Sequence, residues 1–303
     1  MIRINGSVAT IYPIPVTEMS FDGDSVSHYY SAVSGSLPAL RALARGIPST
    51  LVGYSGGVDS ALLAVVLRQE LGRERVLAAV GRSPSYPAAQ WAAARAVAER
   101  FDVPLVELDT HELDDPSYLA NPTNRCFFCK TELWRRLLPE ARARGLAVVC
   151  DGTNADDLSE HRPGHAAGVA AGVRSPLVEA GFTKADVRAA ARELGIPIWD
   201  APAAPCLSSR VAYGIAITPG RLAQVEQAEA YLRELGVTGD LRLRHHGDRA
   251  RIEVEPRWIP WLAGRMPAVV RRLSELGFTA VELDPKGYRR GSLLAGHTSA
   301  PGA

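Results

Sequence analysis

The segment Gly53-Tyr54-Ser55-Gly56-Gly57-Val58-Asp59-Ser60 has the residue types of a phosphate-binding loop. An apolar run precedes it and leucines at helical spacing follow, which predicts a strand, a glycine turn and a helix start. Backbone N–H groups at a helix start are unpaired and carry partial positive charge, and glycine permits close approach of an anion. We therefore expect a nucleotide phosphate to bind at Ser55, Gly56, Gly57 and Ser60.

Asp59 distinguishes this segment from the common ATP-binding loop. That loop carries a lysine before its serine or threonine, whereas no lysine precedes Ser60 here. A carboxylate next to a phosphate requires a divalent cation between the two groups. The sequence therefore predicts that ATP binds together with Mg²⁺.

A second group of reactive residues is Cys126-Phe127-Phe128-Cys129, which Arg125 and Lys130 flank at the expected start of a helix. Two thiols at this spacing reach one metal or each other. The helix terminus and the two basic residues are expected to lower the thiol pKa values. The residues alone leave two interpretations open, a redox dithiol and half of a metal site.

A third thiol, Cys206, follows a proline-rich stretch in Pro205-Cys206-Leu207-Ser208-Ser209-Arg210 and is expected to be accessible. Three cysteines do not complete a four-thiolate zinc site, but they bind three irons of a four-iron cluster and leave the fourth iron open. Cys150 ends an apolar run and is expected to be a small buried residue.

Composition narrows the class of protein. The chain has 303 residues, 47% of them hydrophobic, and neither a membrane-spanning run nor a secretory leader is apparent, so a cytoplasmic location is expected. A net charge of +1 argues against a large nucleic-acid partner. Four cysteines without a leader do not suggest a disulfide framework.

Alternating strands and helices predict an α/β fold with a parallel sheet. The expected strands are 49–54, 75–80, 104–108 and 146–150, and the expected helices are 37–45, 58–71, 87–101, 127–144 and 183–194. The proline-rich link at 200–205 suggests a boundary, which divides the chain into a nucleotide-binding domain (31–200), a smaller α+β domain (201–290) and a disordered tail (291–303). The smaller domain is expected to contain helices 219–235 and 258–276 and strands 241–245, 251–255 and 279–283. Residues 1–30 are left as a disordered extension or an added edge strand.

Ligands of such sheets bind beyond the carboxyl ends of the strands. This rule places Ser55, Gly81, Asp109 and Asp151 near one edge. Asp156 and Asp157 follow the fourth strand and either contact the nucleotide and its magnesium or cap the loop. His161 and His165 are interpreted as loop residues, His245 and His246 as structural or solvated, and Tyr86 and Trp91 as a flap over the site or as core residues.

Four motifs occur in order: Ser55-Gly56-Gly57-Val58-Asp59-Ser60, Asn124-Arg125-Cys126-x-x-Cys129-Lys130, Asp151-Gly152-Thr153-Asn154-x-Asp156-Asp157 and Pro205-Cys206-Leu207-x-Ser209-Arg210. The first motif resembles the PP-loop of the ATP pyrophosphatases. Together the motifs resemble the LarE family, ATP-dependent sulfur transferases of nickel-pincer cofactor synthesis, over about residues 37 to 285.

The resemblance implies that both carboxylates of pyridinium-3,5-biscarboxylate mononucleotide are adenylated and converted to thiocarboxylates. Some family members sacrifice a cysteine matching Cys206 as the sulfur donor, and others deliver sulfide from a [4Fe-4S] cluster. Cys126 and Cys129 indicate the second group, with the cluster held by all three cysteines as catalytic and metal-binding residues. The resemblance also implies ATP and Mg²⁺ at Gly81, Asp151, Thr153 and Asp156, besides the glycine loop.

Substrate binding is expected in the smaller domain, at Ser209, Arg210, Glu226, Glu229, Arg242 and Arg244. Arg242 and Arg244 alternate along a strand and so share one face, and arginine forks match phosphate oxygens. The alternative for these arginines and for both glutamates is a solvated surface.

The resemblance also implies that the chain forms a homo-oligomer. It further implies a partner, not identified by the sequence, that resupplies sulfide. Alternative functions are a PP-loop tRNA thiolase, an ATP-dependent amidotransferase synthetase and a non-enzymatic nucleotide sensor.

Overall fold

The computed structural model describes residues 3–4, 7–8, 35–159, 163–203 and 205–295. The chain separates into two compact units, Met1–Ser34 and Gly35–Ala303. In the first unit, β1 (Arg3–Ile4) and β2 (Ser7–Val8) pair antiparallel with each other. The rest of the extension predicted for residues 1–30 lies outside the described residues.

The second unit contains a four-stranded parallel sheet in the order β5-β4-β3-β6, which confirms the predicted α/β class. Its strands are β3 (Thr50–Gly53), β4 (Val76–Arg82), β5 (Leu105–Asp109) and β6 (Val148–Cys150). The elements around it are α2 (Leu37–Arg45), α3 (Val58–Leu71), η1 (Arg73–Arg75), α4 (Ala88–Arg100), η2 (Glu112–Asp114), α5 (Pro116–Leu119), α6 (Arg125–Ala143), α7 (Asp156–Ser159), α8 (Pro163–Ala170), α9 (Pro176–Glu179) and α10 (Lys184–Glu193).

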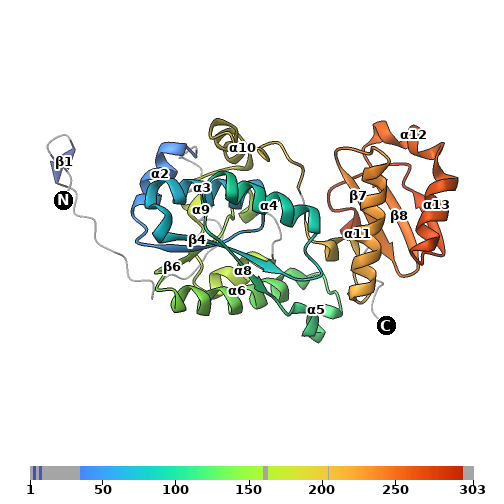
Figure 1. Cartoon of the computed structure of the whole chain (residues 1–303), viewed down its shortest axis with the longest axis horizontal. Coiled ribbons are helices and arrows are strands. Elements are labelled where there is room, and N and C mark those ends of the chain that lie inside the picture. The colour runs from blue at the N-terminus through green and yellow to red at the C-terminus, as the bar shows by residue number, and fades with distance from the viewer. Residues whose placement is uncertain (1–2, 5–6, 9–34, 160–162, 204, 296–303) are drawn as a thin grey trace. The chain divides into compact units, whose positions relative to one another are not determined.

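Side chains of the strands alternate between two apolar cores because successive residues of a strand point to opposite faces. Val52 and Ala78 belong to the core that includes α3, whereas Leu51 and Leu77 belong to the core that includes α6. Figure 1 shows α3 and α4 over one face of the sheet and α6 and α8 over the other. The carboxyl ends of the four strands therefore meet at one edge, as predicted.

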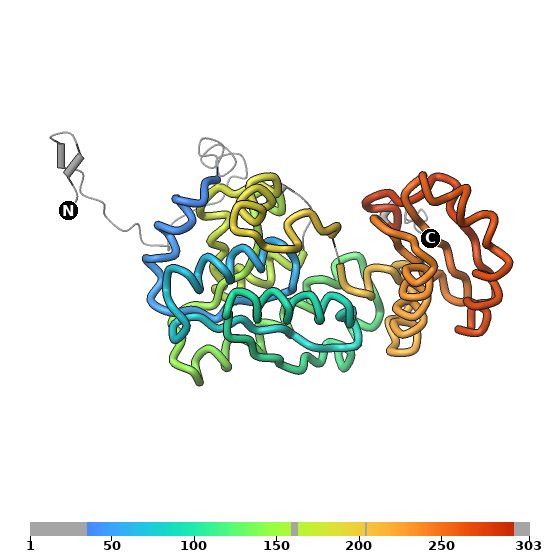
Figure 2. Tube along the Cα trace, turned by 45° about the horizontal axis from the view of Figure 1, so that its top comes forward, coloured from blue at the N-terminus to red at the C-terminus, as the bar shows by residue number. Residues whose placement is uncertain are grey.

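A separate mixed sheet follows, with β7 (Leu241–His246) antiparallel to β8 (Arg249–Val254) and β8 parallel to β9 (Ala280–Leu283). It has its own apolar core, shared with the helix α11 (Pro219–Glu234). The remaining elements are η3 (Leu207–Arg210), η4 (Pro256–Trp258), α12 (Ile259–Ala263), α13 (Met266–Glu275) and α14 (Ser292–Ala295). Figure 2 follows the chain through α11 into this second sheet. The predicted domain boundary near residue 200 stays a prediction.

Three local predictions are wrong. The helix expected at 258–276 is broken into η4, α12 and α13, since α12 ends at Ala263 with Gly264 as its cap and each piece has a proline at its first or second position. His165 lies in α8, because Pro163 stands at the first helical position, where proline is tolerated. His161 lies outside the described residues. Part of the predicted disordered tail forms α14.

None of the helices in the described part of the chain combines the length and the apolar character that crossing a membrane requires.

Candidate functional site

The glycine loop joins β3 to α3 through a compact set of hydrogen bonds. The Ser60 hydroxyl accepts a hydrogen bond from the Ser55 N–H at 3.2 Å and donates to the Gly57 carbonyl at 3.1 Å. Gly56 has a φ of +68°, a conformation that favours glycine, and a Cβ there would lie 2.7 Å from the Ala94 Cβ. Gly57 precedes α3 as its N-cap and supplies no side-chain cap, and a helix start of this kind favours an anion.

Asp59 is held by Asn154, from the third sequence motif, and by Lys184, which the sequence patterns did not single out. Its Oδ2 accepts a hydrogen bond from Lys184 Nζ at 2.5 Å, and its Oδ1 accepts one from Asn154 Nδ2 at 3.0 Å. Lys184 is the first residue of α10, whose predicted capping box of Thr183 and Asp186 is present. The glycine loop has no lysine of its own, but Lys184 of α10 lies beside it. The missing lysine was the only sign in the sequence that another segment would supply one.

The loop after β6 lies directly against the start of α3. A Cβ on Gly152 would come within 2.7 Å of the Ser60 backbone nitrogen, so only glycine permits this approach. Both oxygens of Asp151 accept hydrogen bonds, from Thr153 and from the Ser175 hydroxyl at 2.7 Å. The structure thus shows Asp151 and Thr153 organising the loop that faces the helix start.

Asp156 and Asp157 were expected either to contact the nucleotide and its magnesium or to cap the loop, and both make capping contacts. Asp156 Oδ2 accepts a hydrogen bond from the Lys184 N–H at 2.8 Å, and Asp157 Oδ2 accepts one from the Asn154 N–H at 3.2 Å. Asp156 therefore fixes the helix start that carries Lys184. Gly81 lies within β4, where a Cβ would come within 2.7 Å of the Leu133 side chain, so α6 packs closely on this strand.

Residues after β4 contact the glycine loop. The Tyr86 hydroxyl and Gln90 Nε2 both donate to the Ser55 carbonyl, at 3.0 and 2.6 Å. Burial raises the pKa of Tyr86, so the hydroxyl stays a donor. Trp91 is partly buried and packs against the core that includes α3. Tyr86 is therefore the member of this pair that reaches the site.

The three cysteines of the expected cluster lie on two segments of the chain. Cys126 and Cys129 lie in the first turns of α6, and Cys206 immediately precedes η3. All three are free thiols; Cys126 is exposed, and the other two are half-buried. Burial, and after it an electrostatic contribution from Cys206, raises the pKa of both Cys126 and Cys129.

The expectation that the thiol pKa values are lowered is wrong. Desolvation is the largest influence on Cys126 and on Cys129 and raises both pKa values, and Cys206 adds to the rise. Lys130 lowers both pKa values, and Arg125 lowers that of Cys126, but by less. Although Cys126 is reached by solvent, protein atoms crowd around it, which sequence does not reveal. Cys150 is buried as predicted, and burial raises its pKa to about 11.

Buried polar contacts join α6 to the Cys206 segment. Asn121 is fully buried at a φ of +54°, and its Nδ2 donates to the carbonyls of Val211, Ala212 and Ile215 at 3.3, 2.8 and 2.9 Å. Its Oδ1 accepts a hydrogen bond from Arg125, the residue before Cys126. The Tyr118 and Ser208 hydroxyls form a further buried hydrogen bond of 2.6 Å. These contacts fix the two thiol-bearing segments relative to each other.

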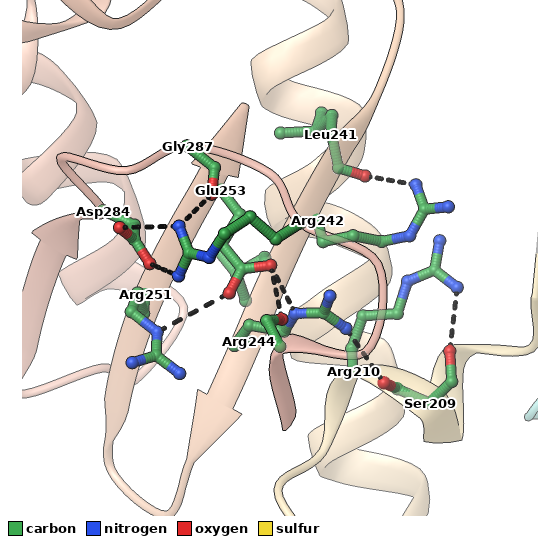
Figure 3. A network of polar contacts seen from close by, with 12 residues as sticks. Ser209, Arg210, Leu241, Arg242, Arg244, Arg251, Glu253, Asp284 and Gly287 are labelled. Carbon is green, nitrogen blue, oxygen red and sulfur yellow. Dashed lines mark hydrogen bonds and ion pairs between the residues drawn. The ribbon is translucent and has the colours of Figure 1, made fainter. Parts of the chain in front are cut away.

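Three arginines lie at this segment: Arg210 ends η3, and Arg242 and Arg244 come from β7 of the second sheet (Figure 3). Arg210 pairs with both oxygens of Glu229 at 3.0 and 3.1 Å, and its Nη1 donates to the carbonyls of Pro205 and Cys206. The Glu229 carboxylate also accepts a hydrogen bond from the Leu243 N–H at 2.9 Å. These contacts occupy most of the Arg210 fork, which favours a positioning role for Arg210 and Glu229 over direct substrate contact.

Arg242 and Arg244 are buried, not solvated. Arg242 donates to the Ala203 carbonyl at 2.6 Å, and Arg244 pairs with the buried Glu253 at 2.8 Å and donates to the Ser209 carbonyl at 3.2 Å. Desolvation lowers the pKa of Arg242, so an anion beside it would be favourable. Both arginines thus present charge next to the Cys206 segment.

The remaining predicted residues have structural contacts. Glu226 Oε1 accepts a hydrogen bond from the Ala88 N–H at 2.8 Å, which caps the start of α4 from α11. His245 is buried and its Nε2 bonds Gln224 Oε1 at 2.9 Å, and burial lowers its pKa to about 4. His246 bonds Arg251. These contacts favour a structural role for both histidines.

The donor set suits a cluster better than a single ion. Across the described ranges, no three His, Cys, Asp or Glu side chains are arranged to hold one metal ion. A four-iron cluster spaces its cysteine ligands more widely, and three converging thiols leave one iron without a cysteine. Cys126, Cys129 and Cys206 would be the residues to hold such a cluster.

Known proteins resemble this chain along most of its length. Residues 42–123 match the NAD synthase family. The pyridinium-3,5-bisthiocarboxylic acid mononucleotide synthase of Lactiplantibacillus plantarum is 36% identical over 254 residues, which cover 84% of this chain and 92% of that protein. An uncharacterized protein of Synechocystis is 41% identical over 263 residues, which cover 86% of this chain and 97% of that protein. An uncharacterized protein of Methanocaldococcus jannaschii is 28% identical over 241 residues, 79% of this chain and 90% of that protein.

The glycine loop at the carboxyl edge of a parallel sheet, together with the NAD synthase match, defines an ATP-using enzyme of the PP-loop class. Its identity with the Lactiplantibacillus synthase extends over most of both chains, and the chain therefore belongs to the LarE family.

Proposed function

We propose that this enzyme is a sulfur transferase that adenylates the carboxylates of pyridinium-3,5-biscarboxylate mononucleotide and converts them to thiocarboxylates for nickel-pincer cofactor synthesis. The observation that carries the proposal is the segment Ser83–Tyr86. Tyr86 contacts the glycine loop at Ser55, and the Ser85 carbonyl accepts a hydrogen bond of 2.8 Å from the Leu207 N–H, next to Cys206. The nucleotide loop and a sulfur-bearing residue are thus connected through one short segment.

On the nucleotide side, the start of α3 with Ser55, Gly57 and Ser60 binds the pyrophosphate part of ATP. Asp59 would hold the Mg²⁺ that accompanies ATP, and the Lys184 ammonium group beside it would stabilise the phosphates. A substrate carboxylate oxygen attacks the α-phosphorus, the bond to pyrophosphate breaks, and an acyl-adenylate forms. This step is needed because a carboxylate oxygen is a poor leaving group and AMP is a good one.

On the sulfur side, Cys126, Cys129 and Cys206 hold a [4Fe-4S] cluster, which supplies sulfide when it is bound. A carbon–sulfur bond forms at the activated carbonyl as the bond to AMP breaks, leaving a thiocarboxylate and AMP. Asn121 and Tyr118 keep the thiol-bearing segments together during this exchange.

The substrate phosphate is assigned to Arg242 and Arg244, which face the Cys206 segment. Their buried guanidinium groups gain from an anionic partner that arginine forks match in shape. Arg210 and Glu229 hold the Ser209 segment in place beside them.

The test is incubation of anaerobic protein with ATP, Mg²⁺ and the biscarboxylate mononucleotide. We expect pyrophosphate, AMP and a product in which sulfur replaces oxygen, detected by mass spectrometry. Pyrophosphate release with tRNA but not with the mononucleotide, and a thiolated tRNA product, would replace this proposal with a tRNA thiolase. Binding of ATP without any pyrophosphate release would reject an enzyme of this kind.

A further inference from the structure

Asp59, the expected ligand of Mg²⁺, has protein donors on both of its carboxylate oxygens. Oδ2 accepts a hydrogen bond from Lys184 Nζ at 2.5 Å, and Oδ1 accepts one from Asn154 Nδ2 at 3.0 Å. The side chain of Asp59 is 21% exposed and that of Lys184 is 38% exposed, so solvent reaches this ion pair. A divalent cation that arrives alone must therefore displace an ammonium group before it can bind Oδ2.

The backbone that carries Lys184 is fixed in place. The Lys184 N–H donates to Asp156 Oδ2 at 2.8 Å, and Lys184 is the first residue of α10. The capping box of Thr183 and Asp186 closes the start of that helix. Only the flexible four-carbon stem of Lys184 has to move for its ammonium group to leave Asp59.

The surroundings of Asp59 offer a metal ion few other protein ligands. Both oxygens of the nearby Asp151 accept hydrogen bonds, from Thr153 and from Ser175. In the part of the chain that the structure describes, no three His, Cys, Asp or Glu side chains are grouped to hold a metal ion. Mg²⁺ commonly binds to one or two carboxylates and completes its octahedron with waters and substrate phosphates. Asp59 fits a site of that kind, in which the ATP phosphates are ligands of the metal.

The same phosphates offer the Lys184 ammonium group a second partner. They are expected at the start of α3, and Asp59 lies in the first turn of that helix. Because Lys184 Nζ contacts Asp59, a phosphate beside this carboxylate is within reach of the lysine stem. Movement of the ammonium group to a phosphate would leave Oδ2 to the metal and would also offset phosphate charge.

We propose that Lys184 is a specificity-determining residue of the nucleotide site: it keeps a free divalent cation off Asp59 and admits the cation only together with ATP. The inference rests on the proposed function only in its first half, the binding of ATP and Mg²⁺ at the glycine loop. It is independent of the acceptor substrate and of the source of sulfur.

The first experiment measures the binding of Mn²⁺, which replaces Mg²⁺ and is visible by electron paramagnetic resonance, to the full chain without nucleotide. Lys184→Met keeps the length of the side chain but removes its charge and its hydrogen bond to Asp59. We expect Lys184→Met to bind Mn²⁺ about 10-fold more tightly than wild type, because the repulsion and the competing donor are gone. The gain should disappear when Asp59→Asn is added, which locates the ion. Lys286→Met, at an exposed lysine, is the matched control and should bind like wild type.

The second experiment measures the affinity for α,β-methylene-ATP, which does not release pyrophosphate, without and with Mg²⁺. Coupling between two ligands is reciprocal, so a lysine that keeps the free metal out also makes nucleotide binding depend more strongly on the metal. The ratio of the two dissociation constants should therefore be about 10-fold smaller in Lys184→Met than in wild type. Association of Mg²⁺ with the nucleotide in solution is the same for both proteins and cancels in this comparison.

The outcomes separate this inference from the proposed function. Equal affinity of wild type and Lys184→Met for free Mn²⁺, or an unchanged ratio of nucleotide affinities, overturns the inference. Lys184→Gln, which also lacks the charge, repeats the comparison if thermal unfolding shows that the methionine variant is weakened. A wild type that forms no thiocarboxylate but shows both effects supports the inference and rejects only the proposed transfer of sulfur.

Discussion

The nucleotide loop and the thiol site are built from the chain in different ways. Ser55 to Ser60 are consecutive, and hydrogen bonds join members of this short segment to one another, in addition to those that reach it from other segments. The thiols come from α6 and from the segment before η3, and they meet only because Asn121, Tyr118 and Ser85 hold those segments together. A local loop is specified by its own residues, whereas the thiol site exists only in the folded chain.

This difference predicts which changes affect one half-reaction and which affect both. Damage to the glycine loop should stop adenylation and leave the thiols in place. Damage to the thiols should stop sulfur transfer and leave adenylation intact. Damage to the contacts between segments should loosen the thiol site before it affects the loop.

The largest expected effect is that of Cys206→Ser. A serine hydroxyl neither ligates iron as a thiolate does nor supplies sulfur, so thiocarboxylate formation should fall on the order of 10³-fold or more. Substrate-dependent pyrophosphate release in a single turnover should remain, as quenched-flow assays will measure. Cys150→Ala is the matched control, because Cys150 is buried beside Thr50 and should affect neither step. Equal loss in both cysteine variants would contradict the separation of the two halves.

Asp59→Asn should reduce pyrophosphate release by about 100-fold, because the amide does not replace a carboxylate as a Mg²⁺ ligand. Iron content should stay at the wild-type level. Asp102→Asn serves as control, since Asp102 pairs with Arg68 and Arg73 on the surface, where ion pairs contribute little. Unchanged pyrophosphate release would remove Asp59 from the nucleotide site.

Asn121→Ala should lower the free energy of unfolding by about 3 kcal/mol, because the buried side chain donates to three carbonyls and accepts from Arg125. Alanine is also strained at the φ of +54°. Urea unfolding gives the free energy, and alkylation of Cys206 should become faster. Asn124→Ala is the control, since Asn124 begins α6 without a side-chain cap bond. A similar loss in both variants would mean that the junction is not specially stabilised.

The smallest expected effect comes from pH. The folded pKa of His245, about 4, lies below its ordinary value of 6.5, so the unfolded chain binds its proton more readily. The contribution to stability is complete above pH 6.5 and is lost as the pH falls towards 4, about 2 kcal/mol between pH 8 and pH 5. Urea unfolding should show a shallower pH dependence in His245→Gln and the wild-type slope in the exposed His111→Gln. An unchanged slope in His245→Gln would mean that another group is responsible.

The sequence predicted what local patterns encode. The bounds of the strands around the glycine loop are correct within two residues because alternation, glycine turns and helical spacing are local signals. The bounds of α3 and the capping box of α10 are confirmed. That Cys126, Cys129 and Cys206 share one cluster stays a prediction, made from the number of cysteines and from the family resemblance.

Tertiary contacts account for what was missed or wrong. Lys184 and Asn121 gain their roles mainly from partners far along the chain, which no spacing rule connects. The thiol pKa values were misjudged because Arg125 and Lys130 are visible in the sequence and desolvation is not. The break at Gly264 was missed since each half of 258–276 has helical spacing by itself.

The most direct test of the account is the iron and acid-labile sulfide content of anaerobically prepared protein, compared with Cys206→Ala. We predict about four irons per chain with at least as much sulfide in wild type, and loss of the intact cluster in the variant. A wild-type protein that contains no iron, and whose Cys206 has become dehydroalanine after one turnover, would show that Cys206 itself is the sulfur donor and would contradict the account.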